Sequence, residues 1–138
     1  MKTILFIDNK QAILDNLVEG FELEGYHVLI ANCGNQGIAL ANEFIPDLIV
    51  SEIIIGKMNG YSVLQELLDG YKTYRIPFIF STTQCEKKDK ALAFQLGADD
   101  YIVKPYGLEE MYIMVNRWIH SGSERIPKNT SIVTNPYF

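Results

Sequence analysis

The stretch Pro46–Gly60, PDLIVSEIIIGKMNG, decides how the rest of the chain is interpreted. Three consecutive apolar residues, two of them β-branched, lie between Asp47 and Ser51, which is typical of a strand buried on both faces. The run leads directly into an acid, Glu52, and then into a glycine-containing loop. A carboxylate at this point lies where open α/β sheets bind their ligands, although an acid can also simply mark the end of a strand.

Length and composition narrow the classes of protein that are possible. A chain of 138 residues is typical of one domain with a single core. Its net charge of −5 argues against a general nucleic-acid-binding surface. The two cysteines, Cys33 and Cys85, have neither a metal-binding spacing nor the pattern of a disulfide framework. The apolar runs are too short for a signal peptide or a bilayer-spanning helix, so we expect a cytoplasmic protein that binds neither nucleic acid nor membrane.

Short apolar runs alternate with helical periodicities along the chain. The runs predict strands at Thr3–Ile7, His27–Ala31, the central run before Ser51, Ile76–Thr83 and Asp99–Val103. Helical spacing predicts buried faces made of Leu14, Leu17, Val18 and Phe21, of Gly37, Leu40, Ala41 and Phe44, of Val63, Leu64, Leu67 and Leu68, and of Leu108, Met111, Tyr112 and Val115. A polar, lysine-rich segment, Glu86–Leu96, predicts one more helix, and the last helix is expected to end near Ser121.

The alternation of strand and helix, repeated five times, predicts the domain organisation. It favours an α/β fold with a parallel sheet and helices on both faces. We expect this domain to occupy residues 1–121. Residues 122–138 are polar, contain two prolines and lack a helical period, which predicts a flexible C-terminal tail without an output domain.

Four of the five predicted strands end in charged, amide or hydroxyl side chains. Because the carboxyl ends of parallel strands share one edge, these side chains should converge on one crevice. Each also has a local explanation: an asparagine can cap the first helix, a threonine can satisfy a backbone group, and a lysine before a turn proline can be solvated. The side chains are Asp8 with Asn9, Glu52, Thr82 with Thr83, and Lys104.

Taken together, these segments resemble the receiver domain of response regulators in two-component signalling, over about residues 1–121. The matching segments are ILFIDN, the GNQGIAL and PDLIV pair, MNGYSVL, IPFIFST, GADDYIVKPY and the final helix. The resemblance implies a flavodoxin-like, doubly wound parallel sheet of five strands, in the order 2-1-3-4-5, flanked by five helices. It also implies a signalling module rather than an enzyme, with a histidine kinase or a downstream effector as its partner.

The resemblance also implies roles for single residues. In the family, two acids after the first strand and an aspartate after the third hold Mg²⁺, and that aspartate accepts a phosphoryl group from a histidine kinase. Asp8 matches the first acid. Thr82, Tyr101 and Lys104 match the switch hydroxyl, the switch aromatic residue and the lysine of the family's Lys-Pro motif, which relay the change to a partner-binding face. As a strand tyrosine, Tyr101 can equally be half-buried packing.

The departures from the family pattern have physical consequences. Asn9 stands where the second acid is expected, and Glu52 stands at the phospho-acceptor position. Gly56–Lys57 replaces the usual proline-glycine pair, and Asn59 replaces an acid of that loop. Mg²⁺ requires hard oxygen ligands in near-ideal octahedral geometry, so the missing charge and the longer side chain should leave Asp8 a weak metal ligand or none. Phosphoryl transfer depends on charge neutralisation and should therefore be slow.

The sequence thus predicts a single-domain receiver-like module that acts by protein–protein contact and is not phosphorylated in the normal way. Glu52 is long enough to reach Lys104 or Thr82, either to imitate part of the phosphorylated state or merely to form a structural pair in a decayed site. One alternative is a conventional receiver that a histidine kinase still phosphorylates. Another is a small phosphohydrolase with Asp8 as nucleophile, although the second acid of that class is replaced by Lys10. A flavin-binding module is not indicated, because the loop after the first predicted strand lacks the Ser/Thr/Gly residues that would bind the flavin phosphate.

Overall fold

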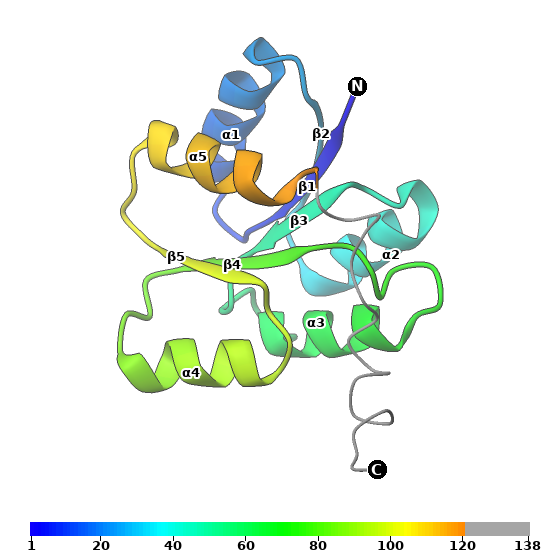
Figure 1. Cartoon of the computed structure of the whole chain (residues 1–138), viewed down its shortest axis with the longest axis vertical. Helices are drawn as coiled ribbons and strands as arrows, with labels where there is room; N and C mark the ends of the chain where they lie inside the picture. Colours follow the sequence, from blue (N-terminus) through cyan, green and yellow to red (C-terminus); the bar gives the residue numbers. More distant parts are fainter. Residues whose placement is uncertain (121–138) are drawn as a thin grey trace.

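The sheet has the predicted strand order. The computed structural model of the chain describes residues 1–120, and its five strands form one parallel sheet in the order β2-β1-β3-β4-β5 (Figure 1). Every neighbouring pair is parallel. The strands are β1 Thr3–Ile7, β2 His27–Ala31, β3 Leu48–Ser51, β4 Phe78–Thr82 and β5 Asp100–Val103. The predicted α/β fold and the order 2-1-3-4-5 are confirmed.

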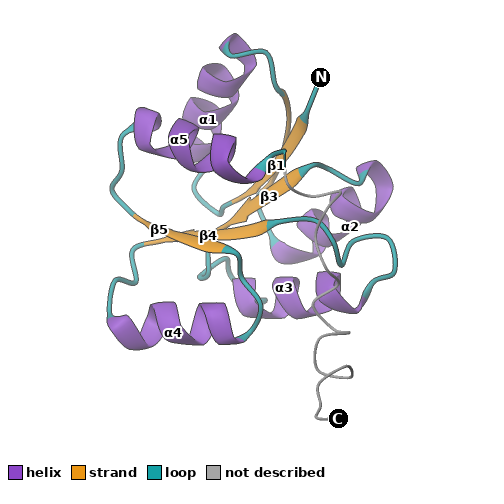
Figure 2. Ribbon diagram, viewed as in Figure 1, coloured by secondary structure: helices purple, strands orange, loops and turns teal. Residues whose placement is uncertain are grey.

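Five helices cover the two faces of the sheet. Helices α1 and α5 lie on one face, and α2, α3 and α4 lie on the other (Figure 2). The helices are α1 Gln11–Leu23, α2 Gly34–Phe44, α3 Gly60–Asp69, α4 Lys87–Gln95 and α5 Leu108–Trp118. The carboxyl ends of β4 and β5 lead into loops at the left of Figure 1, so the strand ends predicted to carry the site share that edge.

Alternate residues of the central strands enter two separate core layers. In β1, Ile4 and Phe6 pack in the layer under α1 and α5, while Leu5 and Ile7 pack in the layer under α2 and α3. All four are at most 1% exposed. Successive side chains of a strand point to opposite faces, so a strand covered by helices on both sides must be apolar throughout. This burial explains the continuous apolar runs in the sequence.

Two predicted core positions are wrong. Phe44 was expected in the buried face of its helix but is 47% exposed, because α2 ends there and the chain turns at Ile45 into a left-handed conformation with φ of 45°. Leu108, expected on the buried face of the last helix, is 38% exposed at the first position of α5. Helical spacing identifies a face, but a residue at the end of a helix has no neighbouring turn to keep it against the core.

The first two strands have the predicted bounds, and other predicted boundaries differ from the observed ones by one to three residues. The fourth strand begins at Phe78 rather than two residues earlier, because Pro77 has no N–H for the ladder. The last helix ends at Trp118, short of the predicted end near Ser121. The domain boundary at residue 121 and the tail 122–138 lie outside the described residues. Within residues 1–120, no helix is long and apolar enough to cross a membrane.

Candidate functional site

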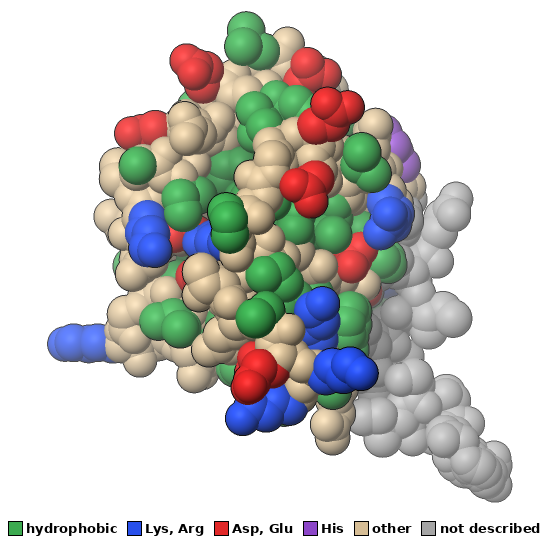
Figure 3. Space-filling view, turned by 90° about the vertical axis from the view of Figure 1, so that its left-hand side faces the viewer, with side chains coloured by type: hydrophobic (Ala, Val, Ile, Leu, Met, Phe, Trp, Pro, Cys, Tyr) green, Lys and Arg blue, Asp and Glu red, His purple; other side chains and the backbone are tan. Residues whose placement is uncertain are grey.

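The candidate site lies at the edge of the sheet where the strands end. Figure 3 looks onto this side of the molecule, where acidic and basic side chains are interspersed with hydrophobic ones. Asp8 follows β1, Glu52 follows β3, Thr82 ends β4 and Lys104 follows β5. The register places the ends of β1 and β3 side by side, since Ile7 pairs with Ser51. The topology therefore brings together residues that are far apart in the sequence.

A lysine lies between two carboxylates at the centre of the site. Lys104 Nζ is 2.6 Å from Asp8 Oδ2 and 2.9 Å from Glu52 Oε1. The three side chains are only 5–8% exposed. The side chain of Glu52 therefore reaches Lys104, as its length suggested, and Lys104 binds Asp8 as well. We call Asp8, Glu52 and Lys104 the buried triad.

The other two carboxylate oxygens of the buried triad are bound to backbone N–H groups. Asp8 Oδ1 accepts a hydrogen bond of 3.0 Å from the backbone N–H of Lys10. Glu52 Oε2 accepts hydrogen bonds of 2.6 Å from Ile53 and 3.2 Å from Ile54. All four carboxylate oxygens thus have donors within the chain. The side chain of Glu52 curls back over the loop that follows it, which holds both the loop and the carboxylate in place.

Burial and hydrogen bonding act in opposite directions on the charges of the buried triad. Burial alone raises the pKa of Glu52, but hydrogen bonds from Lys104, Thr82 and the backbone of Ile54 outweigh it, so the pKa lies below its ordinary value. Burial alone lowers the pKa of Lys104, but hydrogen bonds to Asp8 and Glu52 outweigh that effect and raise the pKa. Glu52 is therefore ionised and Lys104 protonated at neutral pH.

Two hydrogen bonds join the loop after β4 to Thr82, next to the buried triad, and to strand β5. Thr82 is fully buried, and its side chain helps to lower the pKa of Glu52. Its Oγ1 accepts a hydrogen bond of 3.3 Å from Gln84 N. The Gln84 carbonyl in turn accepts a hydrogen bond of 2.7 Å from the Tyr101 hydroxyl. Tyr101 is 8% exposed and packs edge-on against Phe80, and burial raises its pKa. Its side chain is buried packing in this structure, and its hydroxyl contacts the loop that leads to α4.

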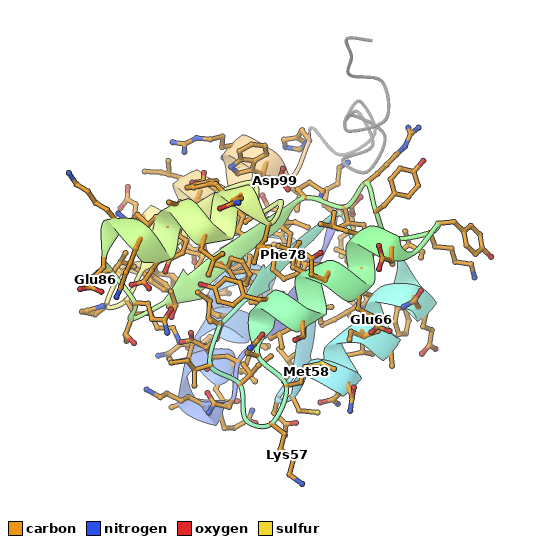
Figure 4. All side chains as sticks on the ribbon, turned by 90° about the horizontal axis from the view of Figure 1, so that it is seen from below. Lys57, Met58, Glu66, Phe78, Glu86 and Asp99 are labelled. Carbon is orange, nitrogen blue, oxygen red and sulfur yellow. The ribbon has the colours of Figure 1, made fainter. Side chains whose placement is uncertain are left out.

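Apart from Glu52, the residues described here that depart from the family pattern do not join the buried triad. Asn9 is exposed on the turn after β1. It does not cap the first helix, because the N-cap residue of α1 is Lys10, which makes no side-chain cap bond. Asn59 caps α3 by accepting a hydrogen bond of 2.9 Å from the backbone three residues on. Lys57 points away from the protein into solvent (Figure 4).

Two residues of the site were missed by the sequence reasoning. Gly60 donates a hydrogen bond of 2.6 Å to the Ile53 carbonyl, and a Cβ there would overlap the backbone of Glu52 and Ile53. Tyr106 follows Lys104 by two residues; burial raises its pKa, and a hydrogen bond with Ser81 opposes the rise. The signals were present in the sequence, as a glycine at the start of a helix and a tyrosine directly after the lysine-proline pair.

The donor set does not fit the Mg²⁺ that the resemblance implies. Mg²⁺ keeps near-ideal octahedral oxygen coordination, whereas every oxygen of Asp8 and Glu52 already accepts a hydrogen bond. The Lys104 ammonium, itself a cation, already lies within 2.9 Å of both carboxylates. Within residues 1–120, histidine, cysteine and acidic side chains form no group of three that could hold a metal ion.

Sequence comparisons find similarity to known proteins over most of this chain. A family model described as the response regulator receiver domain matches residues 4–116. The DNA-binding dual master transcriptional regulator RpaA of Synechocystis is 38% identical over 128 residues, covering 93% of this chain and 53% of the relative. The response regulator SaeR of Staphylococcus aureus is 34% identical over 116 residues, covering 84% of this chain and 50% of the relative. The chain spans about half the length of these curated relatives.

Solved structures have the same fold. The non-phosphorylated HemR receiver domain of Leptospira biflexa superimposes with a TM-score of 0.79 at 27% identity, covering 87% of this chain and 95% of that one. A CheY-like receiver domain protein of Methanospirillum hungatei gives a TM-score of 0.82 at 25% identity, covering 90% of this chain and 98% of that one. These similarities extend over nearly all of the described residues.

Proposed function

Because this chain belongs to the response regulator receiver domain family, we propose that it is a two-component signalling module that acts by protein–protein contact without ordinary phosphorylation. The observation that carries the proposal is the Lys104 ammonium held between Asp8 and Glu52. Glu52 occupies the position of the phospho-acceptor, and its carboxylate provides a permanent negative charge beside Thr82 and Lys104. The module works in the cytoplasm, with a histidine kinase or a downstream signalling protein as its partner.

The contacts of Glu52 oppose phosphoryl transfer. A nucleophilic carboxylate oxygen must be free to approach phosphorus, but Oε1 is bound to Lys104 and Oε2 to two backbone N–H groups. Catalysis of this transfer depends on positioning and charge neutralisation. Lys104 is already neutralised within the buried triad, and the donor set does not fit Mg²⁺. The incoming phosphoryl group would therefore meet uncompensated negative charge.

The same contacts support a signalling role for the carboxylate. Glu52 acts on Thr82, Thr82 accepts from Gln84, and the Gln84 carbonyl accepts from the Tyr101 hydroxyl. We infer that a carboxylate held in one position keeps Thr82 and Tyr101 in one arrangement without a phosphodonor. A partner that binds near β5 and the start of α4 would then find its surface permanently formed.

The contacts of Asp8 argue against the phosphohydrolase alternative. Receiver domains are typically signalling modules without enzymatic activity. As a nucleophile, Asp8 would need a free oxygen, but its two oxygens bind Lys104 and the backbone of Lys10. We therefore propose that the chain is not an enzyme.

The test is to restore the missing chemistry at two positions. Asn9→Asp returns a charge to the metal site, and Glu52→Asp draws the carboxylate back by one methylene and frees it from the loop N–H groups. With acetyl phosphate and Mg²⁺, intact mass spectrometry should show phosphoryl addition to the double variant and none to the wild type. Each single variant should recover only a fraction, because metal and nucleophile act as a unit.

The matched control is the double variant Asn9→Asp with Glu52→Asn, which has the restored metal ligand but no nucleophile and should stay unlabelled. A wild-type protein that labels readily would support the conventional-receiver alternative and refute the proposal. A double variant that stays inert would show that the Gly56–Lys57 loop or another feature also prevents transfer, contradicting the assignment to two positions.

A further inference from the structure

A second candidate site lies at the opposite edge of the sheet, where the strands begin. A pocket of about 300 Å³ opens between the residues that precede β1, β3 and β4 and the end of α5. Its lining includes Lys2, Pro46, Pro77 and His120. None of these residues belongs to the buried triad or to the loops around it. We call this pocket the amino-edge pocket.

The rim of the amino-edge pocket is basic, although the chain as a whole is acidic. Lys2, Lys72, Arg75 and His120 line it, against a net charge of −5 for the chain. Asp47, the one acidic side chain among the lining residues within 1–120, accepts a hydrogen bond of 2.8 Å from a backbone N–H of β1 and lies 3.9 Å from the Lys2 ammonium. A local excess of cations on an acidic protein attracts anionic groups to that place.

The floor of the pocket is apolar and contains a strained residue. Ile76 and Ile119 are buried beneath it, while Ile45 remains 42% exposed. Ile45 has a φ of 45°, a left-handed conformation that is unfavourable for a β-branched residue. Such strain concentrates at functional sites, where the position of a side chain matters more than local stability. Here the strained residue presents an exposed apolar side chain beside a basic rim.

We propose that the amino-edge pocket binds a short acidic peptide segment of a partner protein. One apolar side chain of the peptide packs against Ile45 and the floor, and flanking carboxylates pair with Lys72 and Arg75. The volume lies at the lower end of ligand pockets and accommodates a side chain rather than a folded surface. A nucleic acid or an anionic membrane would need a broader basic surface than this one rim, on a chain whose net charge repels it.

The test is a binding titration on the full chain. The probe is a fluorescein-labelled peptide with a single leucine flanked on both sides by glutamates, followed by fluorescence anisotropy. We expect saturable binding that weakens as salt is added. The double charge reversal Lys72→Glu with Arg75→Glu should weaken binding more than about tenfold. The matched control is Lys88→Glu on the exposed surface of α4, which should change the affinity less than about twofold.

A second variant separates the pocket from general electrostatics. Ile45→Asn removes the apolar side chain but keeps a residue that tolerates the left-handed conformation, so the fold should persist in circular dichroism. Binding should weaken about fivefold, and a peptide with serine in place of leucine should lose a similar factor.

Several outcomes would overturn the proposal. The first is that the double reversal Lys72→Glu with Arg75→Glu binds the peptide as tightly as the wild type does. The second is that Ile45→Asn leaves the affinity unchanged, and the third is that the serine peptide binds as well as the leucine peptide. Tighter binding of a single-stranded oligonucleotide or of anionic vesicles through the same lysine and arginine would assign the pocket to another class of ligand. Failure here leaves the proposed function intact, since Glu52 and Lys104 lie at the other edge.

Discussion

The two edges of this sheet treat charge in opposite ways. At the carboxyl edge, Lys104 is buried and has two carboxylates within 2.9 Å. At the amino edge, Lys72 is exposed, with its ammonium 5.9 Å from the centre of the Tyr71 ring. A buried charge must be paired inside the protein, whereas an exposed one remains hydrated. The carboxyl edge, where charge is more concentrated, is therefore less available to an outside ligand, because its charges are already paired within the protein.

The largest expected effect comes from removing the cation at the carboxyl edge. Lys104→Met leaves Asp8 and Glu52 close together without compensation, which should lower the free energy of unfolding by about 3–5 kcal/mol. Lys72→Met is the matched change at the amino edge and should alter it by less than about 0.5 kcal/mol. Urea unfolding of the two variants measures the difference directly.

A double-mutant cycle sharpens this result. Adding Glu52→Gln to Lys104→Met removes one of the stranded carboxylates, so the two changes should cost less together than their sum. If the effects simply add, or if Lys72→Met is as damaging as Lys104→Met, the two edges do not differ as described.

An intermediate effect is expected from the backbone of the carboxyl edge. Gly60→Ala places a Cβ against the backbone of Glu52 and Ile53, which cannot move aside as a flexible side chain can, and should cost about 1–3 kcal/mol in urea unfolding. Gly107→Ala is the control, because a Cβ there meets only the Glu110 carboxylate at 3.6 Å. Equal stability of the two variants would mean that the loop after β3 is looser than the contacts indicate.

The smallest expected effect is the pH dependence of the buried triad, because there the effect of burial on each pKa opposes the effect of the hydrogen bonds. The lowered pKa of Glu52 contributes stability above its ordinary value of 4.5, and this is lost as the pH falls through the folded-state pKa. The raised pKa of Lys104 contributes stability below 10.5, which is lost as the pH rises through the folded-state pKa.

Unfolding measured in urea at several pH values tests this dependence. The contribution of the pair should be constant across the neutral range, and below about pH 4.5 the wild type should lose more stability than Glu52→Gln. Parallel curves for the two proteins would show that Glu52 gains nothing from its partners.

Local sequence patterns were sufficient for most of the fold. Apolar runs such as Thr3–Ile7 and His27–Ala31 became strands with the predicted bounds, because burial on both faces requires such runs. The same patterns failed at helix ends. Phe44 continues the helical spacing but is exposed, because Ile45 reverses the chain immediately after it. The spacing of apolar residues predicts which face of a helix is buried, whereas the tertiary structure determines at which residue the helix ends and its side chains leave the core.

The sequence by itself predicted that Asp8, Glu52, Thr82 and Lys104 would lie at the carboxyl edge, because parallel strands align their ends, but Asn9, expected with them, is exposed on the turn after β1. It also indicated that Glu52 was long enough to reach Lys104. Only the tertiary structure decided that Lys104 would bind Asp8, 96 positions away, as well as Glu52. The amino-edge pocket was not visible in the sequence at all, since its rim comes from Lys2, Lys72, Arg75 and His120. The physical reason is that propensity and periodicity act between neighbours in the chain, whereas pairing of charges depends on distances that only the folded sheet sets.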